Sequence, residues 1–353
     1  MANTHEGSAP APDDPVPDNP AAGNRAGTVS TRPVALVTGA SRGLGFLLAR
    51  ELGDRGHAVV ICARSGEGLR AAREDLAGRG TEVLAVEADV ADPDDVTRLM
   101  SETEDRFGRL DMLVTNAGVI QVGPAPDIRV ADHVKAMDAM FWGTVHPVRA
   151  ALPLLRRRRG RVLAVTSVGG KLPAPHLLPY TAAKHAAVGF AEGLRVEADA
   201  LGVGVTVAVP GLMRTGSPRN ALFTGRRAAE QRWFTLAAST PVLSMDAERA
   251  ARRLVRAALR GRPEVVLTPA AKLGVRLHAL APGLTLRALA LTARLLPAPV
   301  GSPDDAPDPT RPAPGPVPGH ATGRRTGWFA RLTRLDRDAA RRWHEHDDEV
   351  PAE

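Results

Sequence analysis

The sequence predicts an α/β fold: a doubly wound parallel sheet of seven strands with a helical C-terminal extension. Between residues 33 and 268, longer segments of helical pattern alternate with seven short apolar runs: VALVT, AVVICA, VLAVEA, LDMLVT, RVLAVTS, GVTVAVP and EVVLT. Strands buried on both faces of a parallel sheet have this continuous apolar character, and the intervening segments are long enough for crossover helices. A glycine-rich turn after the first run also favours this fold class.

The chain divides into one predicted sheet domain and several additions. It has 353 residues, of which 44% are hydrophobic and 24% charged, with 34 Gly and 30 Pro. Residues 1–30 have almost no large apolar side chains, so we expect a disordered tail. The sheet domain is expected over 31–268, followed by an amphipathic helical extension at 269–297. A Pro-rich linker, extended or disordered, is expected at 298–327. A short docking helix with a tail is expected at 328–353, because apolar residues recur there at helical spacing: Trp328, Leu332, Leu335, Ala339 and Trp343.

The charge pattern argues against nucleic acid and metal. The net charge is +7, but the arginines are scattered through the chain rather than gathered with aromatic residues. The run RRRR at 156–159 is interpreted as a solvated corner between a helix and a strand. The closing HEHDDE is interpreted as a solvated acidic end rather than a metal site, because no spaced His/Cys set accompanies it.

The sequence favours a cytoplasmic location. A single cysteine, Cys62, excludes an internal disulfide and fits a reducing compartment. No secretory pattern opens the chain, and no uncharged apolar stretch reaches the ~18–20 residues needed to span a bilayer. Membrane contact is expected to be at most peripheral, through residues 269–297.

The extension at 269–297 has two open interpretations. If it is one helix, Lys272, Arg276, Arg287 and Arg294 fall within a narrow arc and form a cationic stripe, interrupted at Pro282. The apolar remainder would pack on the parent domain or on a subunit neighbour. Alternatively, the helix would lie in a membrane interface or guard a lipophilic site.

The stretch VALVTGASRGLG predicts a dinucleotide site. It places Thr38, Gly39, Gly43 and Gly45 directly after the first strand and at the start of a helix. Glycines there permit a tight turn and a close approach of the backbone to a pyrophosphate, which the helix N-terminus stabilises. The strand, turn and helix context is the one that this motif requires.

The end of the second strand favours a phosphorylated cofactor. Enzymes that prefer NAD(H) usually place a carboxylate there for the ribose 2′-hydroxyl. This chain has Ala63 and Arg64, with Arg42 nearby in the glycine turn. Two guanidinium groups suit a 2′-phosphate, so we predict NADP(H) in preference to NAD(H).

The stretch PYTAAKH predicts a proton donor. It holds the chain's one tyrosine, Tyr180, and one of its few lysines, Lys184. Residues four apart lie about 5–6 Å from each other on one helix face. A tyrosine that exchanges its proton near neutrality needs its pKa lowered by about 2–3 units from 10. A neighbouring ammonium and an oxidised nicotinamide ring both favour the phenolate.

Together these motifs resemble the short-chain dehydrogenase/reductase family over roughly residues 33–268. They occur in the family's order: T-G-x-x-x-G-x-G from Thr38 to Gly45, Asp89–Val90, Asn116–Gly118, Ser167, Tyr180-x-x-x-Lys184, and Pro210–Thr215. The resemblance implies a Rossmann-like fold, NAD(P)-dependent interconversion of a carbonyl and a secondary alcohol, and a homo-oligomer.

The resemblance also implies residue roles. Ser167 would hydrogen-bond the substrate oxygen, Tyr180 would transfer the proton, and Lys184 would bind the nicotinamide ribose and lower the tyrosine pKa. Asn116 would support this catalytic set from the middle of the sheet. The implied cofactor contacts are Thr38, Gly39, Ser41, Arg42, Gly43, Leu44, Gly45, Arg64, Asp89, Val90, Asn116, Ala117, Gly118, Tyr180, Lys184, Pro210, Gly211 and Thr215.

One position departs from the family pattern. The family often has an asparagine in the long central helix, where it helps a water chain relay protons to the lysine; this chain has Met140 there. A thioether is only a weak acceptor. The relay would then use backbone carbonyls and water, or a polar neighbour such as Thr144 or, less directly, His146.

The segment after PGLMRT suggests the substrate. It contains Leu222, Phe223, Trp233, Phe234 and Leu236. An apolar pocket there would bind a lipophilic ketone or secondary alcohol. The same side chains could instead cover the sheet or a subunit contact.

Two other functions stay open. One is a non-catalytic NADP(H)-binding sensor or scaffold of the same fold, suggested by Met140 and the long C-terminal extension. The other is an epimerase or dehydratase of related architecture, although those usually have the glycine spacing G-x-x-G-x-x-G.

Overall fold

A seven-stranded parallel sheet forms the centre of the molecule, as predicted. The computed structural model describes residues 29–240, 244–300, 315–322 and 334–345. The strand order is β11-β7-β6-β4-β1-β2-β3, with every neighbouring pair parallel. The strands are β1 (Val34–Thr38), β2 (Ala58–Ala63), β3 (Val83–Glu87), β4 (Met112–Thr115), β6 (Arg161–Val165), β7 (Gly204–Val209) and β11 (Glu264–Val266).

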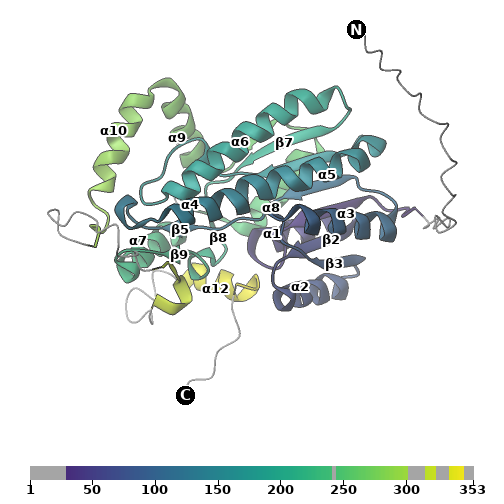
Figure 1. The fold of residues 1–353 in the computed structure, drawn as a ribbon, viewed down its shortest axis with the longest axis horizontal. Helices are drawn as coiled ribbons and strands as arrows, with labels where there is room; N and C mark the ends of the chain where they lie inside the picture. The colour runs from purple at the N-terminus through teal and green to yellow at the C-terminus, as the bar shows by residue number, and fades with distance from the viewer. Residues whose placement is uncertain (1–28, 241–243, 301–314, 323–333, 346–353) are drawn as a thin grey trace, which may run out of the picture.

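Helices cover both faces of this sheet (Figure 1). One face packs against α1 (Gly43–Gly53), α2 (Gly66–Gly78) and α8 (Ala247–Leu259). The other packs against α3 (Pro93–Phe107), α5 (Gly143–Arg158) and α6 (Leu178–Asp199). Because the inner strands are buried from both sides, their residues are apolar without alternation, which is why the sequence pattern was informative.

The strand order reverses at β1, whose neighbours are β2 on one side and β4 on the other. In doubly wound sheets the ligand crevice lies outside the carboxyl ends of the strands at such a switch point. The turn after β1 and the loops after β4 and β6 therefore meet at one edge. The arginine run at 156–159 lies at the opposite end, where α5 ends and Arg159 adopts a left-handed conformation before β6.

Two small sheets lie beyond the carboxyl edge. One joins β8 (Leu212–Arg214) to β10 (Ser244–Asp246), and α7 (Arg227–Ser239) packs on it. The other joins β5 (Gln121–Val122), β9 (Leu222–Phe223) and β12 (Val317–Pro318). β12 belongs to the predicted linker, and its extended backbone is one of the two forms expected there. There, backbone pairing with β9 and the burial of Gly319 hold the chain against the domain.

The extension forms two helices rather than one rod. α9 (Pro269–Leu280) and α10 (Pro282–Ala293) contact each other and are separated at Ala281, whose backbone leaves the helical region. His278 Nδ1 lies 2.7 Å from Thr285 Oγ1 across this break. The predicted single cationic stripe is therefore wrong, because the break reorients the second helix. No helix in the described ranges has the length and apolar character needed to cross a bilayer.

The C-terminal region contains α12 (Arg334–Arg342). Of the residues predicted to form a docking face, Ala339 and Trp343 are buried against the cluster that includes α1 and α8. Trp328 and Leu332 lie outside the described residues, as does the predicted tail up to residue 28.

Candidate active site

A cavity of about 690 Å³ opens at the carboxyl edge of the sheet. The segments that follow β1, β2, β3, β4, β6 and β7 line it, together with parts of α6, α7 and the C-terminal region. Every predicted catalytic or cofactor residue except Thr38 is part of this lining. Gly39 and Thr215, which lie 176 positions apart in the sequence, are thus brought to one site by strand order.

The glycine turn has the shape of a phosphate cradle. Gly39 has φ +61°, and a Cβ there would lie 2.8 Å from the Cα of Ala117. A Cβ at Gly45 would lie 2.1 Å from the carbonyl oxygen of Gly39. Helix α1 begins at Gly43 with no side-chain cap and no acidic residue in its first turn. This arrangement lets backbone N–H groups and the positive end of the helix face a pyrophosphate.

Thr38 and Asn116 hold the turn in place from behind. Thr38 is fully buried, and its hydroxyl accepts hydrogen bonds from the backbone N–H groups of Asn116 (2.9 Å) and Ala117 (3.1 Å). The side-chain amide of Asn116 donates to the carbonyl oxygens of Thr38 and Gly39, both at 3.1 Å. Thr38 is therefore a positioning residue rather than a wall of the site. Asn116 lines the cavity, but its amide nitrogen is committed to the glycine turn.

The adenosine end of the cavity is lined by Arg42, Arg64, Asp89 and Val90. Arg64 is exposed there, at the end of β2, with no acidic residue in the place where a 2′-hydroxyl partner is expected. Arg42, in the glycine turn, lines the same cavity. The cradle, the cavity volume and these two guanidinium groups fit a phosphorylated dinucleotide.

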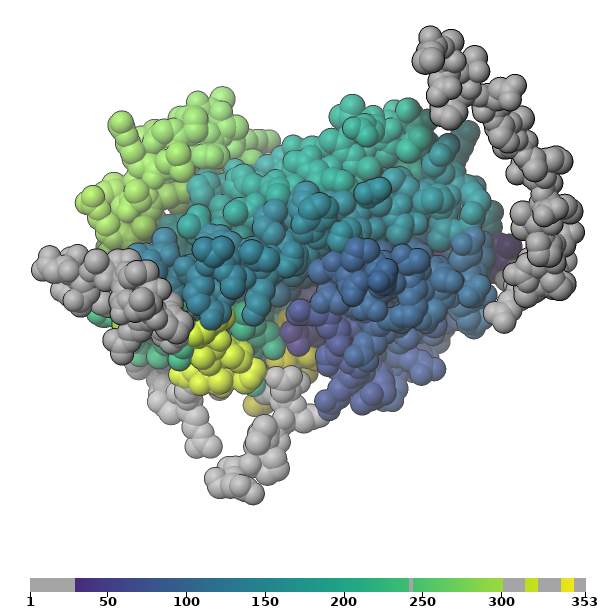
Figure 2. Space-filling view, in the orientation of Figure 1, coloured from purple at the N-terminus to yellow at the C-terminus, as the bar shows by residue number. Residues whose placement is uncertain are grey.

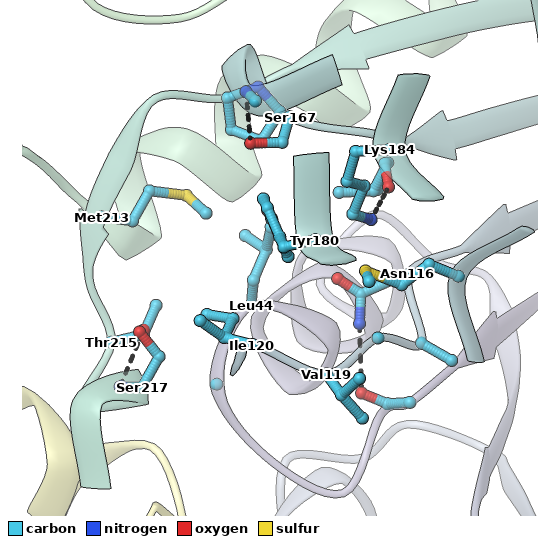
Figure 3. Close-up of a pocket in the computed structure, with 18 of the residues that line it drawn as sticks. Leu44, Asn116, Val119, Ile120, Ser167, Tyr180, Lys184, Met213, Thr215 and Ser217 are labelled. Carbon is cyan, nitrogen blue, oxygen red and sulfur yellow. Dashed lines mark hydrogen bonds between the residues drawn. The ribbon is translucent and has the colours of Figure 1, made fainter. Parts of the chain in front are cut away.

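Ser167, Tyr180 and Lys184 meet in the middle of the cavity (Figure 3). Tyr180 and Lys184 lie one turn apart near the start of α6, and Ser167 follows β6. The hydroxyls of Ser167 and Tyr180 are hydrogen-bonded, and Ser167 Oγ also accepts from the N–H of Gly169 at 3.0 Å. A Cβ at Gly169 would lie 3.0 Å from the tyrosine ring, so glycine there admits the ring.

The electrostatics of this set differ from the sequence-based expectation. Burial raises the pKa of Tyr180, and the hydrogen bond with Ser167 opposes this only in part. Lys184 is 5% exposed, and burial lowers its pKa to about 8. Its ammonium donates to the carbonyl oxygen of Val165 at 3.1 Å and lies 6.0 Å from the centre of the tyrosine ring. Desolvation thus dominates the tyrosine pKa in this structure, and the lowering expected from Lys184 together with an oxidised nicotinamide stays a prediction.

Met140 fills the position of the missing asparagine. It lies in a π-helical segment (Asp138–Trp142) between α4 (Val130–Met137) and α5, and it lines the cavity. Thr144 donates its hydroxyl to the Met140 carbonyl at 2.8 Å, while the His146 ring stacks on Trp142. Neither candidate relay residue lines the cavity. Of the predicted routes, the one through main-chain carbonyls keeps structural support, since Lys184 already contacts one.

The end of the cavity near α7 is apolar. Of the five predicted side chains, Trp233 and Phe234 line it. Phe223 is buried in the core behind it, Leu222 is half-buried in β9 outside the lining, and Leu236 is exposed. Trp233 is held by its indole N–H, which donates to the buried carboxylate of Glu230 at 2.6 Å. The remaining apolar lining was missed from the sequence because loops and distant helices supply it: Val119, Ile120, Leu177, Leu212, Met213, Ala237 and Leu296.

Glu345 was also missed, and it lies in the cavity wall near the glycine turn. Its side chain is almost fully buried; Oε2 is 3.6 Å from Arg42 Nε and accepts a hydrogen bond from Asn220. The chain beside it is fixed by the N–H of Gly43, which donates to the Trp343 carbonyl at 2.8 Å. The prediction of a solvated acidic end is thus wrong for this residue. The rest of the chain, residues 346–353, lies outside the described part. Among the described residues, no group of three or more His, Cys, Asp or Glu could hold a metal ion.

Comparisons with known proteins agree with this geometry. A sequence model of the short chain dehydrogenase family matches residues 33–222. An 11-beta-hydroxysteroid dehydrogenase A of Sesamum indicum is 36% identical over 65% of this chain and 66% of its own length. Among such plant relatives the chain spans between 52% and 67% of their lengths.

Solved structures show the same fold. A short chain dehydrogenase/reductase from Burkholderia phymatum, in complex with NAD, matches 72% of this chain and 95% of its own with a TM-score of 0.66 and 25% identity. An actinorhodin polyketide ketoreductase variant with NADPH matches 69% of this chain and 99% of its own with a TM-score of 0.59 and 26% identity. The chain belongs to the short-chain dehydrogenase family.

Proposed function

We propose that the protein is an NADP(H)-dependent oxidoreductase that interconverts a lipophilic ketone and its secondary alcohol. One observation supports this most directly: Ser167, Tyr180 and Lys184 line the same cavity as the glycine turn. A protein that only binds a dinucleotide has no need of a buried phenol hydrogen-bonded to a serine. The name of the sesame relative, a hydroxysteroid dehydrogenase, supports a lipophilic alcohol as substrate.

When bound, the nicotinamide would supply the hydride that adds to the carbonyl carbon, and the positive charge of its oxidised form would favour the phenolate. Tyr180 would donate its phenolic proton to the carbonyl oxygen, and Ser167 would hydrogen-bond the same oxygen. Lys184 would hold the nicotinamide ribose with its ammonium. Burial raises the pKa of Tyr180, so the phenol carries its proton before the reaction, the state in which it can donate to a carbonyl oxygen.

The preference for NADP(H) is supported by Arg42 and Arg64 at the adenosine end. The lipophilic substrate is supported by the apolar wall, where Glu230 fixes the ring of Trp233 and so defines a rigid surface. Rigid apolar walls with few polar groups select ligands by the area that they remove from water.

The test is NADPH consumption over a panel of carbonyl compounds, with wild type and Tyr180→Phe compared. We expect turnover of lipophilic ketones that falls roughly 10²- to 10⁴-fold in the variant, because the proton donor is lost. NADPH binding, measured by fluorescence, should be unchanged. Equal turnover by the variant would refute the role of Tyr180, and NADPH binding without turnover of any carbonyl by wild type would favour the sensor.

A further inference from the structure

The helices α9 and α10 form an apolar arm on the surface. In Figure 2 this arm is the green lobe that stands off one corner of the molecule. α10 buries none of its residues. Leucines on both helices are exposed, with Leu280 at 83% and Leu284 at 70%, on either side of the break. The others are Leu273, Leu277, Leu286 and Leu291, with Leu295 just after α10. So many exposed apolar side chains on one segment mark an interaction site.

The arm carries only positive charge. Residues 269–300 contain no Asp or Glu, but they contain Lys272, Arg276, Arg287 and Arg294. Lys272 and Arg276 turn toward the body of the protein, since both line a surface groove rather than the leucine face. A helix with leucines on one face and Lys or Arg on another is the form that lies in the interface of an anionic bilayer.

That groove extends the cationic surface beyond the arm. It has a volume of about 470 Å³ and lies between α8, β11 and α9. Its cationic lining consists of Arg253, Arg256, Arg260, Arg262, Lys272 and Arg276. None of these six lies within ion-pair distance of a carboxylate in the described part of the chain. The one acidic residue of the lining, Glu264, is paired with Lys171 at 2.9 Å. The groove therefore presents uncompensated positive charge beside the exposed leucines.

The arm also reaches the active site. Thr292 on α10 and Leu296 just after it line the catalytic cavity, whose lining also includes Trp233 and Phe234. A surface that holds the arm would thus lie next to the cavity. This continuity links the exposed leucines to the substrate site.

We propose that the α9–α10 arm and the adjacent groove bind the surface of an anionic lipid bilayer, and that the lipophilic substrate passes from it into the cavity beside Thr292 and Leu296. The second half rests on the proposed function. Charge favours a bilayer over a second copy of the chain as the occupant. An isologous contact places the same patch on both subunits, and the arm and groove offer each other only cations. Phosphate headgroups supply the missing negative charge.

The experiment measures flotation of the full chain with vesicles of phosphatidylcholine alone or mixed with phosphatidylglycerol. We expect wild type to float with the mixed vesicles and to bind plain ones at least tenfold more weakly. The double variant Leu280→Glu/Leu284→Glu should lose binding, while Leu201→Glu, a change of an exposed leucine far from the arm, should retain it. Arg256→Ala should weaken binding to mixed vesicles roughly fivefold, the effect of one interfacial cation, and Arg73→Ala on α2 should not.

Two results would overturn the proposal. One is failure of wild type to bind mixed vesicles. The other is a leucine double variant that still binds mixed vesicles but has lost an oligomer that wild type forms in ultracentrifugation. NADPH consumption with a water-soluble carbonyl is measured in parallel for every variant. Flotation without turnover by wild type would leave the bilayer contact standing and count against the proposed oxidoreductase alone. Turnover stimulated by mixed vesicles in wild type, but not in the double variant, would support the substrate route.

Discussion

Lys184 should destabilise the folded protein at neutral pH, although the proposed reaction needs it. Burial lowers its pKa from 10.5 to about 8. That difference corresponds to about 3 kcal/mol of disfavoured charge in the folded state. Replacing Lys184 with Met removes this cost but leaves the Val165 carbonyl without its hydrogen bond, which costs about 1 kcal/mol. The variant Lys184→Met should therefore be more stable than wild type by about 2 kcal/mol at pH 7.

The pH dependence identifies the cause of this stabilisation. The group titrates near 8 in the folded chain and near 10.5 in the unfolded chain, so between these values the unfolded chain binds more protons. Wild-type stability should consequently rise with pH in this window relative to the variant, and the advantage of the variant should disappear by about pH 10.

Urea unfolding of both proteins from pH 7 to 10 measures this difference. Lys135→Met, which replaces an exposed lysine, is the control and should change stability by less than about 0.5 kcal/mol at every pH. A Lys184→Met protein that is less stable than wild type at pH 7, or a difference that does not vary with pH, would refute the reasoning.

Two further changes test the cofactor end. Arg42→Ala and Arg64→Ala should each weaken NADPH binding by roughly 10- to 100-fold, the value of one charge-assisted hydrogen bond. NADH binding by these variants, and NADPH binding by the control Arg73→Ala, should stay near wild type. Titration by fluorescence measures this, and equal losses for both cofactors would contradict a 2′-phosphate contact. Glu345→Gln should tighten NADPH binding roughly fivefold, or about 1 kcal/mol, because a carboxylate at the glycine turn repels a pyrophosphate. The control Glu197→Gln should not change NADPH binding. Weaker NADPH binding by Glu345→Gln would show instead that the carboxylate supports the site.

The sequence predicted the parts of the molecule that are determined locally. Runs such as AVVICA become buried strands because both of their faces are covered, and the glycine turn depends on backbone conformations available within a few residues. Tyr180 and Lys184 meet because they are one helical turn apart. In each case the physical cause lies within a short stretch of chain, so the pattern contains the information.

The remaining features depend on contacts between distant segments. The Asn220 amide meets the Glu345 carboxylate across 125 residues, and nothing in the composition of either segment indicates this. The break at Ala281 turns α10 away from the axis of α9, so a helical wheel drawn over both was misleading. Burial raises the pKa of Tyr180 in the structure. The sequence predicted the spacing of Tyr180 and Lys184, but it did not predict that both side chains are desolvated.

These long-range contacts suggest how this chain differs from the shared fold. The family match ends at residue 222, and it contains the glycine turn, Ser167, Tyr180 and Lys184. The segment with Glu345 closes on the cavity at the pyrophosphate end, whereas α10 borders it at the apolar end. Both additions touch the cavity rim without contributing to the proposed proton transfer. If the reaction is common to the family, these two segments would select the cofactor and the substrate. Changes in them should then alter the KM for cofactor or substrate more than kcat.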